Sequence, residues 1–199
     1  MNRILRTAAL AVALVPALAL GQATTWNIDS SHSRTGFSVR HLVITDVRGE
    51  FAKTAGKAQI DDADLSKSSV EVTIEVGSVD TRDEKRDNHL KSADFFDAAK
   101  FPTITFKSTK VTPGKDGALT VVGNLTMRGV TKPVTLEGSI TKAITDPGGF
   151  TRRGVSLTGK LDRKEWGVSW SKVTDVGAVA SDEVKLDIQA EVVKDVPKK

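Results

Sequence analysis

The chain has 199 residues and a formal net charge of +4, and it is 39% hydrophobic, 27% charged and 5% aromatic, with no cysteine or tyrosine. These values predict one ordinary soluble domain and exclude disordered, collagen-like and coiled-coil proteins, as well as disulfides and thiol chemistry. Because basic and acidic residues alternate along most of the sequence, without a basic stripe interleaved with aromatics, we expect no nucleic-acid partner.

The first 23 residues have the pattern of a secretory signal peptide. Arg3 and Arg6 form a positively charged start, an apolar run follows at 8–20, and small residues suited to cleavage end the segment. We therefore expect an exported, periplasmic protein whose mature part, residues 24–199, is one domain. Loss of the two arginines lowers its formal net charge from +4 to +2. No later apolar run is long enough to cross a bilayer, so we expect no transmembrane segment after signal removal. A short N-terminal anchor is the alternative.

From Trp26 onward, apolar and polar residues alternate, which is typical of β-strands with one buried and one exposed face. The clearest run is 70–76, where Val70, Val72 and Ile74 alternate with glutamate and threonine. β-Branched residues are abundant in these runs, as expected for side chains that pack on a pleated sheet. Further strands are expected at Phe37 and Val39; Ile104 and Phe106; Leu119, Val121, Leu125 and Met127; Val134, Leu136 and Ile140; Val155, Leu157 and Leu161; and Val184, Leu186, Ile188, Ala190 and Val192.

Short polar segments separate these strands and predict tight connections. Turn residues cluster at 61–62, 113–117 and 146–149, and a longer polar stretch covers 171–182. Consecutive strands joined by short turns favour an antiparallel meander, and closure into a barrel removes its exposed edges. We predict an all-β fold with about eight strands, which is enough for a barrel that encloses one small ligand.

One segment, 81–99, departs from strand periodicity and predicts one or two short helices inserted between strands. Ser92 is a candidate N-cap that would divide it. In a helix, Arg82, Arg86 and His89 would share one face, which would bring two cations and an imidazole to the end of the barrel interior. The alternative is a solvated helix that only plugs the barrel.

Three groups of motifs follow one another along almost the whole chain after the signal segment. The first is IDSSHS at 28–33, the second combines SVDT at 78–81 with RDNHLKS at 86–92 and DFF at 94–96, and the third covers 123–134. Together they resemble the YceI-like family of periplasmic, polyisoprenoid-binding, lipocalin-like proteins.

The resemblance implies an eight-stranded antiparallel, lipocalin-like barrel with a short inserted helical segment and a long apolar pocket for an isoprenoid or other long-chain lipid. Known ligands of that family include polyprenyl diphosphates, isoprenoid quinones and fatty-acid derivatives, and no catalytic activity defines it. The resemblance therefore implies a binding protein that sequesters or carries a lipid and needs no cofactor.

If the interior is a pocket, burial of the lipid tail would supply the affinity, at about 25 cal/mol per Å² of apolar surface. The alternative is an interior filled by its own side chains, as in many barrels of this size. The expected lining is the inward-facing set near the helix and the middle of the barrel: Phe37, Val39, Phe51, Ile74, Val76, Phe95, Phe96, Phe106, Leu125, Leu136 and Trp166.

A diphosphate or quinone head group would need fixed hydrogen-bond donors, and arginine offers a planar fork suited to phosphate oxygens. The candidates, in order, are Arg86, His89, Arg82 and His41. The alternative is that Asp87 and Asp94 hold Arg86 or His89 in a structural ion-pair network.

Other classes of function fit the sequence less well. His32 and His41 are nine residues apart and face opposite sides of a continuous strand, and His89 lacks an HExxH partner, so we expect no metal site. No GxSxG motif is present. A lipid isomerase or hydrolase is an alternative only if acid–base side chains beside the pocket act on a bound lipid. The remaining alternatives are fatty-acid or fatty-amide binding, and a packed barrel that acts as a periplasmic interaction or stress protein. A homodimer is an option for the oligomeric state.

Overall fold

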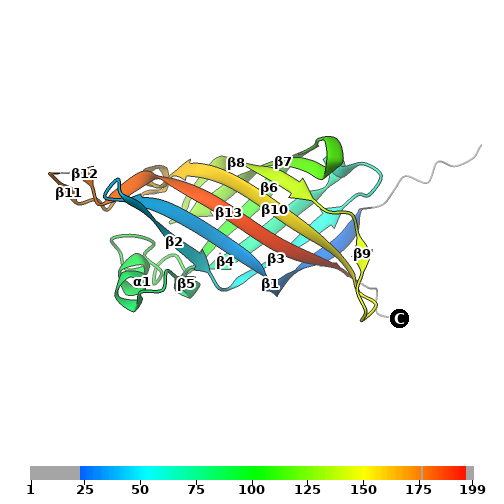
Figure 1. The fold of residues 1–199 in the computed structure, drawn as a ribbon, viewed down its shortest axis with the longest axis horizontal. Helices are drawn as coiled ribbons and strands as arrows, with labels where there is room; N and C mark the ends of the chain where they lie inside the picture. The colour runs from blue at the N-terminus through cyan, green and yellow to red at the C-terminus, as the bar shows by residue number, and fades with distance from the viewer. Residues whose placement is uncertain (1–22, 176, 196–199) are drawn as a thin grey trace, which may run out of the picture.

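The structure is a computed structural model that describes residues 23–175 and 177–195 (Figure 1). The predicted signal peptide, apart from Ala23, lies outside the described residues. Within these ranges, no helix is both long enough and apolar enough to span a bilayer.

The described residues form mostly strands. The strands are β1 (Thr24–His41), β2 (Thr45–Phe51), β3 (Thr54–Ile60), β4 (Ser69–Glu75), β5 (Val79–Asp80), β6 (Thr103–Pro113), β7 (Ala118–Met127), β8 (Val130–Ile140), β9 (Ile144–Thr145), β10 (Thr151–Asp162), β11 (Val173–Thr174), β12 (Gly177–Ala178) and β13 (Ala180–Lys194). The helices are α1 (Glu84–Lys91) and four short 3-10 helices, η1 (Leu65–Lys67), η2 (Val76–Ser78), η3 (Lys115–Gly117) and η4 (Arg163–Trp166).

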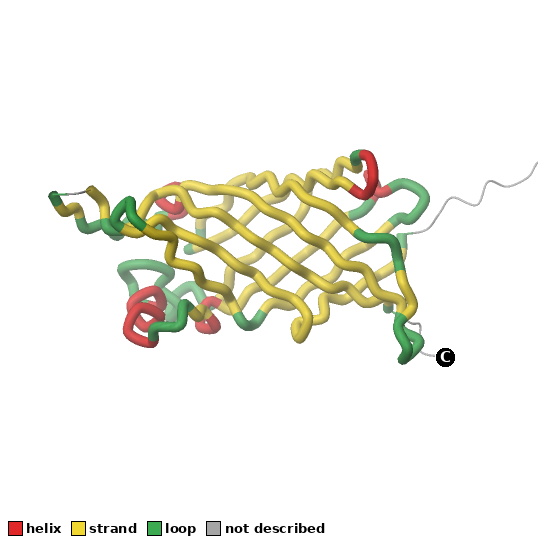
Figure 2. The backbone as a smooth tube through the Cα atoms, in the orientation of Figure 1, coloured by secondary structure: helices red, strands yellow, loops and turns green. Residues whose placement is uncertain are grey.

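Eight of the strands close into an antiparallel barrel. Around the barrel, hydrogen-bonded neighbours follow the order β1, β3, β4, β6, β7, β8, β10 and β13, and β13 pairs again with β1 (Figure 1). Closure means that none of these eight strands is left at an edge. The predicted all-β, eight-stranded antiparallel barrel is confirmed, and Figure 2 shows its strands winding obliquely around one interior.

Strand β1 is long enough to pair with two strands in succession. Its first part pairs with β3, with Trp26 opposite Ala58, and its second part pairs with β2, with Thr35 opposite Phe51. Between Asp29 and the second part, the register against β13 shifts, as in a β-bulge. Because β2 also pairs with the short β5, this side of the barrel leads directly into the segment that carries α1.

Burial along the strands follows the predicted alternation. In β4, Ile74 is buried whereas Glu71 and Glu75 on the opposite face are exposed. Two glycines make room for aromatic rings: a Cβ on Gly49 would lie 2.5 Å from Cζ of Phe37, and a Cβ on Gly123 would overlap the ring of Phe106. The apolar series of β7 is interrupted at Gly123 because the ring from β6 occupies that space.

The predicted inserted helical segment is α1 alone. Asp83 is its N-cap, and the carboxylate of Asp83 accepts a hydrogen bond from the backbone N–H of Arg86 at 3.0 Å. The prediction that Ser92 is an N-cap was wrong, because Ser92 is the C-cap of α1 and the residues at 93–99 form turns and no second helix. Arg82 precedes the helix with a φ of 64°, so it does not share the helical face of Arg86.

The two ends of the barrel differ. At one end, the fully buried Trp26 packs with Ala58, Ile60 and Val192 and closes the interior. At the other end lie α1, η4 and the β11–β12 hairpin, which projects beyond the barrel (Figure 1). The hairpin occupies part of the 171–182 stretch that was predicted as a polar connection.

Candidate functional site

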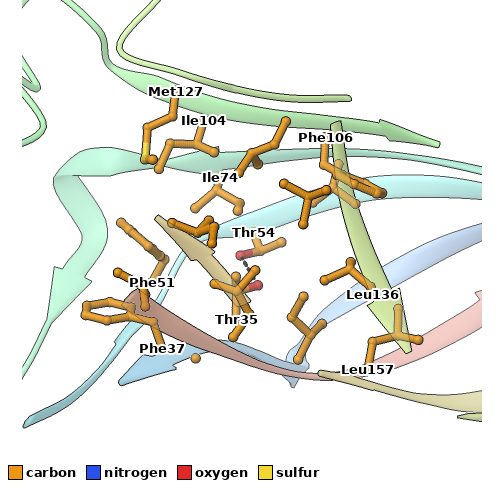
Figure 3. A pocket seen from close by; sticks show the side chains of 18 of the residues that line it. Thr35, Phe37, Phe51, Thr54, Ile74, Ile104, Phe106, Met127, Leu136 and Leu157 are labelled. Atoms are coloured by element: carbon orange, nitrogen blue, oxygen red, sulfur yellow. Dashed lines mark hydrogen bonds between the residues drawn. The ribbon is translucent and has the colours of Figure 1, made fainter. Parts of the chain in front are cut away.

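The barrel encloses an apolar cavity of about 470 Å³. This volume lies within the range of about 300–1,000 Å³ that is typical of small-molecule sites. Its wall is almost entirely aliphatic and aromatic, and Figure 3 shows Phe51, Ile104 and Leu157 among the side chains around one space. Two polar residues at its centre, Thr35 and Thr54, satisfy each other through a hydrogen bond of 3.0 Å between their hydroxyls. The cavity can therefore accept an apolar chain and offers it few polar partners.

Nine of the eleven side chains predicted to line a pocket lie on the cavity wall. They are Phe37, Val39, Phe51, Ile74, Phe95, Phe96, Phe106, Leu125 and Leu136. Val76 and Trp166 are buried at 1% exposure but are not among the wall residues. Val76 begins η2 after β4 has ended, and Trp166 lies in η4, where its indole N–H donates to the carbonyl of Leu125 at 3.0 Å. At both positions the chain has left the barrel wall.

Apart from Phe106, the aromatic wall residues gather at the end of the cavity that carries α1. The ring of Phe51 lies 5.6 Å from that of Phe37 and 5.7 Å from that of Phe96, measured between centroids. Trp170, which the sequence analysis missed, lies 5.2 Å from Phe95. Because Trp170 belongs to the loop after η4 and not to a strand, its position gave no periodic signal.

A group of three polar residues, the buried Thr81 and Asp87 and the partly buried Arg86, lies at the same end of the barrel. The guanidinium of Arg86 donates from Nε to the hydroxyl of Thr81 at 2.7 Å and from Nη2 to the carbonyl of Thr81 at 2.6 Å. The hydroxyl and backbone N–H of Thr81 donate in turn to the carboxylate of Asp87, at 2.5 and 2.9 Å. Arg86 and Thr81 line the cavity. Within the described ranges, Nη1 of Arg86 makes no hydrogen bond and is not fully buried, so this nitrogen stays accessible.

Of the other three candidate head-group residues, two line the cavity and one does not. His89 lines the cavity, and its Nε2 lies 2.9 Å from a carboxylate oxygen of Asp94. His41 lines the cavity from β1, and its Nδ1 lies 2.8 Å from the carbonyl oxygen of Val179. Arg82 is exposed and is not among the wall residues. The structure therefore places Arg86, His89 and His41 at the cavity and Arg82 outside it.

The cavity extends to the end of the barrel opposite Trp26, and we take this rim as its mouth. There its wall includes Val39, Val47 and Val184, which are all partly exposed. Arg163, another wall residue that the sequence analysis missed, is 4% exposed and fixes this rim. Its guanidinium donates to the carbonyls of Val168, Trp170 and Ser181 at 2.6, 2.8 and 3.0 Å, so it joins the loop after η4 to the start of β13.

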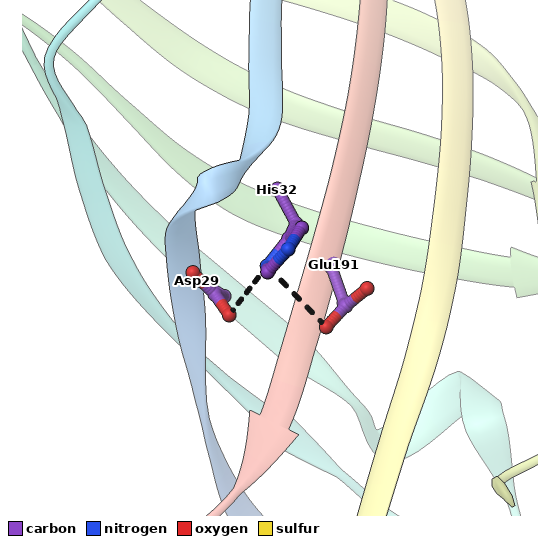
Figure 4. Close-up of side chains that lie close together, drawn as sticks. All are labelled: Asp29, His32 and Glu191. Carbon is purple, nitrogen blue, oxygen red and sulfur yellow. Dashed lines mark hydrogen bonds and ion pairs between the residues drawn. The ribbon is translucent and has the colours of Figure 1, made fainter. Parts of the chain in front are cut away.

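A second polar cluster, Asp29, His32 and Glu191, lies on β1 and β13, with His32 exposed (Figure 4). Nδ1 of His32 lies 3.0 Å from Oδ2 of Asp29 and 4.0 Å from Oε1 of Glu191. The hydrogen bond with Asp29 raises the pKa of His32, and hydrogen bonds from Ser31 and His32 lower the pKa of Asp29. Because Arg152 also contacts both carboxylates, we assign the cluster to a surface ion-pair network.

Comparisons with known proteins agree with this geometry. A sequence model of the YceI-like domain matches residues 26–192. The YceI protein of Salmonella newport is 40% identical over 163 residues, which cover 82% of each chain. The crystal structure of the YceI protein of Campylobacter jejuni has a TM-score of 0.68 at 32% identity, covering 79% of this chain and 90% of that one.

A third comparison is with a polyisoprenoid binding domain from Saccharophagus degradans, implicated in plant cell wall breakdown. Its structure has a TM-score of 0.60 at 13% identity and covers 87% of this chain and 99% of that one, which shows a shared fold. The family match, by contrast, spans nearly all the described residues and includes each of the three motif groups. The chain therefore belongs to the YceI-like family.

Proposed function

We propose that this protein is an exported binding protein that takes the apolar chain of an isoprenoid-type lipid into its barrel. The observation that carries the proposal is the apolar cavity of about 470 Å³, which extends from the packed Trp26 cluster to the rim beside α1. Burial of the chain would supply the affinity, because each CH₂ group removed from water contributes about 0.8 kcal/mol. The fold shared with a polyisoprenoid binding domain supports this ligand class.

The polar group at the α1 end favours a phosphorylated head group. Thr81 and Asp87 hold the guanidinium of Arg86 at the cavity wall with one nitrogen free within the described ranges. A diphosphate matches the planar donors of arginine better than a quinone carbonyl does, because charged oxygens accept stronger hydrogen bonds. Polyprenyl diphosphates are therefore the first choice of ligand, and isoprenoid quinones are the second.

We propose reversible binding and not catalysis. The two imidazoles on the cavity wall are already engaged, His89 by the carboxylate of Asp94 and His41 by the carbonyl of Val179. The hydroxyl of Thr81 is held between Arg86 and a carboxylate. These arrangements support a role in positioning donors at the end of an apolar chain, which carriage of a lipid requires and which needs no bond to be broken.

Export through a signal peptide at residues 1–23 is part of the proposal, since a carrier is needed where a long apolar chain must cross water. The support is the charged start, apolar run and small residues of this segment. N-terminal sequencing of the protein from a periplasmic extract should find a first residue close to position 22 or 24. Retention of Met1 on a cytoplasmic protein would contradict export.

Lipid titration of the purified mature chain tests the ligand class. Wild type, Arg86→Ala and Lys85→Ala are each titrated with a polyprenyl diphosphate and with the uncharged polyprenol of the same length, and wild type is also titrated with a fatty acid. Lys85 is the matched control because it is an exposed cation on the same helix and is not a wall residue.

We expect wild type and Lys85→Ala to bind both lipids and to prefer the diphosphate. Arg86→Ala should lose about tenfold or more in affinity for the diphosphate only, as expected for one or two hydrogen bonds to a charged group. Binding of a fatty acid alone would assign the cavity to that alternative ligand. Failure to bind any of these chains would overturn the proposal in favour of an interaction protein.

A further inference from the structure

The β1–β2 turn and the β11–β12 hairpin expose apolar side chains beside the mouth of the cavity. Val43, Ile44 and Val173 are 70%, 77% and 75% exposed, and we call these three side chains the apolar tip. The two segments adjoin, because the backbone N–H of Leu42 donates to the carbonyl of Val179 at 3.2 Å. Figure 1 shows both segments at the same end, with the hairpin projecting beyond the barrel.

The backbone conformation of the β1–β2 turn is energetically unfavourable for the apolar residues at its centre. The N–H of Ile44 donates to the carbonyl of His41 at 2.9 Å, and the two central residues, Leu42 and Val43, have φ values of 48° and 62°. Turns with positive φ at both central positions favour Asn-Gly, and a β-branched residue is rarely found there. Neither burial nor turn geometry accounts for valine at position 43, and this observation suggests a role in contact outside the chain.

The apolar tip continues the wall of the cavity. Val39 and His41 line the cavity directly before the turn, and Val47 lines it directly after the turn. On the other side of the mouth, Val179 lines the cavity directly after the hairpin. A chain that enters the cavity therefore passes between apolar walls that lead to the tip.

We propose that the apolar tip docks on a lipid bilayer, with the cavity mouth facing the membrane. This inference rests on the proposed function, because a long apolar chain can move from bilayer to cavity without exposure to water only if the mouth touches the membrane. Exposed apolar patches mark either membrane or protein contacts. Here three side chains offer far less than the roughly 1,200 Å² that a specific protein interface buries, whereas binding to a bilayer surface scales with the apolar area buried and requires no interface of that size.

The charges near the tip indicate that docking depends on apolar insertion. Arg40, just before the turn, forms an ion pair of 3.1 Å with Asp46, just after it. Lys185 lies 4.0 Å from the same carboxylate. Because the two cations beside the β1–β2 turn are paired, and Lys172 is the exposed cation that adjoins Val173, we expect binding to vesicles to change little with salt, unlike binding driven by clusters of cations on anionic lipids.

Flotation with vesicles of phosphatidylethanolamine and phosphatidylglycerol tests the inference on the mature chain. The variant is Val43→Gly/Ile44→Thr, which removes the apolar side chains and supplies a residue that tolerates positive φ. The matched control is Ile144→Thr, since Ile144 is 63% exposed but lies in β9 at the opposite end of the barrel. Thermal unfolding of each variant, and its binding of polyprenyl diphosphate without vesicles, are measured in parallel.

We expect wild type and Ile144→Thr to float with the vesicles at both low and high salt. The double variant should lose about tenfold or more in its partition coefficient, while its Tm is equal or higher and its lipid binding without vesicles is unchanged. Equal flotation of the double variant, loss of flotation in Ile144→Thr, or absence of flotation in wild type would each overturn the docking proposal. A dimer that the double variant disrupts would assign the tip to a second copy instead. If the wild type binds polyprenyl diphosphate yet does not float, only the docking inference fails.

Discussion

Asp87 is the buried anchor of the polar group at the α1 end of the cavity. Its carboxylate accepts hydrogen bonds from the N–H and the hydroxyl of Thr81 at 2.9 and 2.5 Å, and Thr81 in turn holds the guanidinium of Arg86. Asp87 is 9% exposed and Thr81 is 5% exposed, so water cannot fully replace the carboxylate. The substitution Asp87→Ala therefore leaves two buried donors without their acceptor.

The size of the effect follows from these two bonds. A hydrogen bond to a charged group contributes about 1.5–3 kcal/mol, so the loss of two such bonds in Asp87→Ala should lower the free energy of unfolding by about 3–6 kcal/mol. Asp87→Asn keeps an acceptor oxygen of similar size but not the charge, and we expect about half of that loss. Since 1 kcal/mol shifts Tm by about 2–4 °C in a domain of this size, Asp87→Ala should lower Tm by about 10 °C.

Urea unfolding followed by tryptophan fluorescence measures this loss. The control is Asp83→Ala, which removes the exposed N-cap of the same helix and should cost about 1 kcal/mol. If Asp87→Ala were no less stable than Asp83→Ala, the carboxylate of Asp87 would not be the anchor, and the reasoning from buried donors would be refuted.

Three further predictions concern the rim, the barrel interior and the outer surface. Arg163→Ala should lose about 3 kcal/mol or more in urea unfolding, because the 4% exposed guanidinium joins the loop after η4 to β13; a smaller loss would show that the rim does not depend on it. Gly123→Ala should lower the stability by about 1–3 kcal/mol in calorimetry, because the added methyl overlaps the ring of Phe106, and an unchanged Tm would contradict this packing. The hydrogen bond with Asp29 raises the pKa of His32 above 6.5, so its contribution to stability is complete below that pH and is lost as pH rises through the raised pKa. An NMR titration should find the raised value, and the stability difference between wild type and His32→Asn should shrink at higher pH.

The sequence predicted which face of a strand a side chain occupies better than it predicted where the strand ends. The alternation of apolar and polar residues correctly predicted that Ile74, Phe106 and Leu136 face the interior, because the pleat of a strand fixes which face each residue occupies. The same rule placed Val76 on the wall, but Val76 lies in the 3-10 helix η2, where the two-residue period no longer applies. Trp166, also expected on the wall, lies in the 3-10 helix η4. Periodicity carries no information about where a strand ends.

Residues that act from loops could not be predicted. Trp170 and Arg163 reach the cavity from the connection between β10 and β13. Trp170 packs on the ring of Phe95, which is distant in sequence, and Arg163 donates to backbone carbonyls, which residue type does not reveal. Arg82 was grouped with Arg86 on an assumed helical face, but its positive φ places it before the helix begins. In each case the deciding factor is a backbone conformation that composition and spacing do not reveal.

The central claim is that the barrel holds a lipid chain, and native mass spectrometry of the mature protein purified gently from a periplasmic extract tests it most directly. The account predicts an added mass that organic extraction releases as a long-chain lipid of isoprenoid type, and a smaller bound fraction in Arg86→Ala than in Lys85→Ala. A protein that carries no added mass, and that also fails to retain added polyprenyl diphosphate, quinone or fatty acid, would contradict the account.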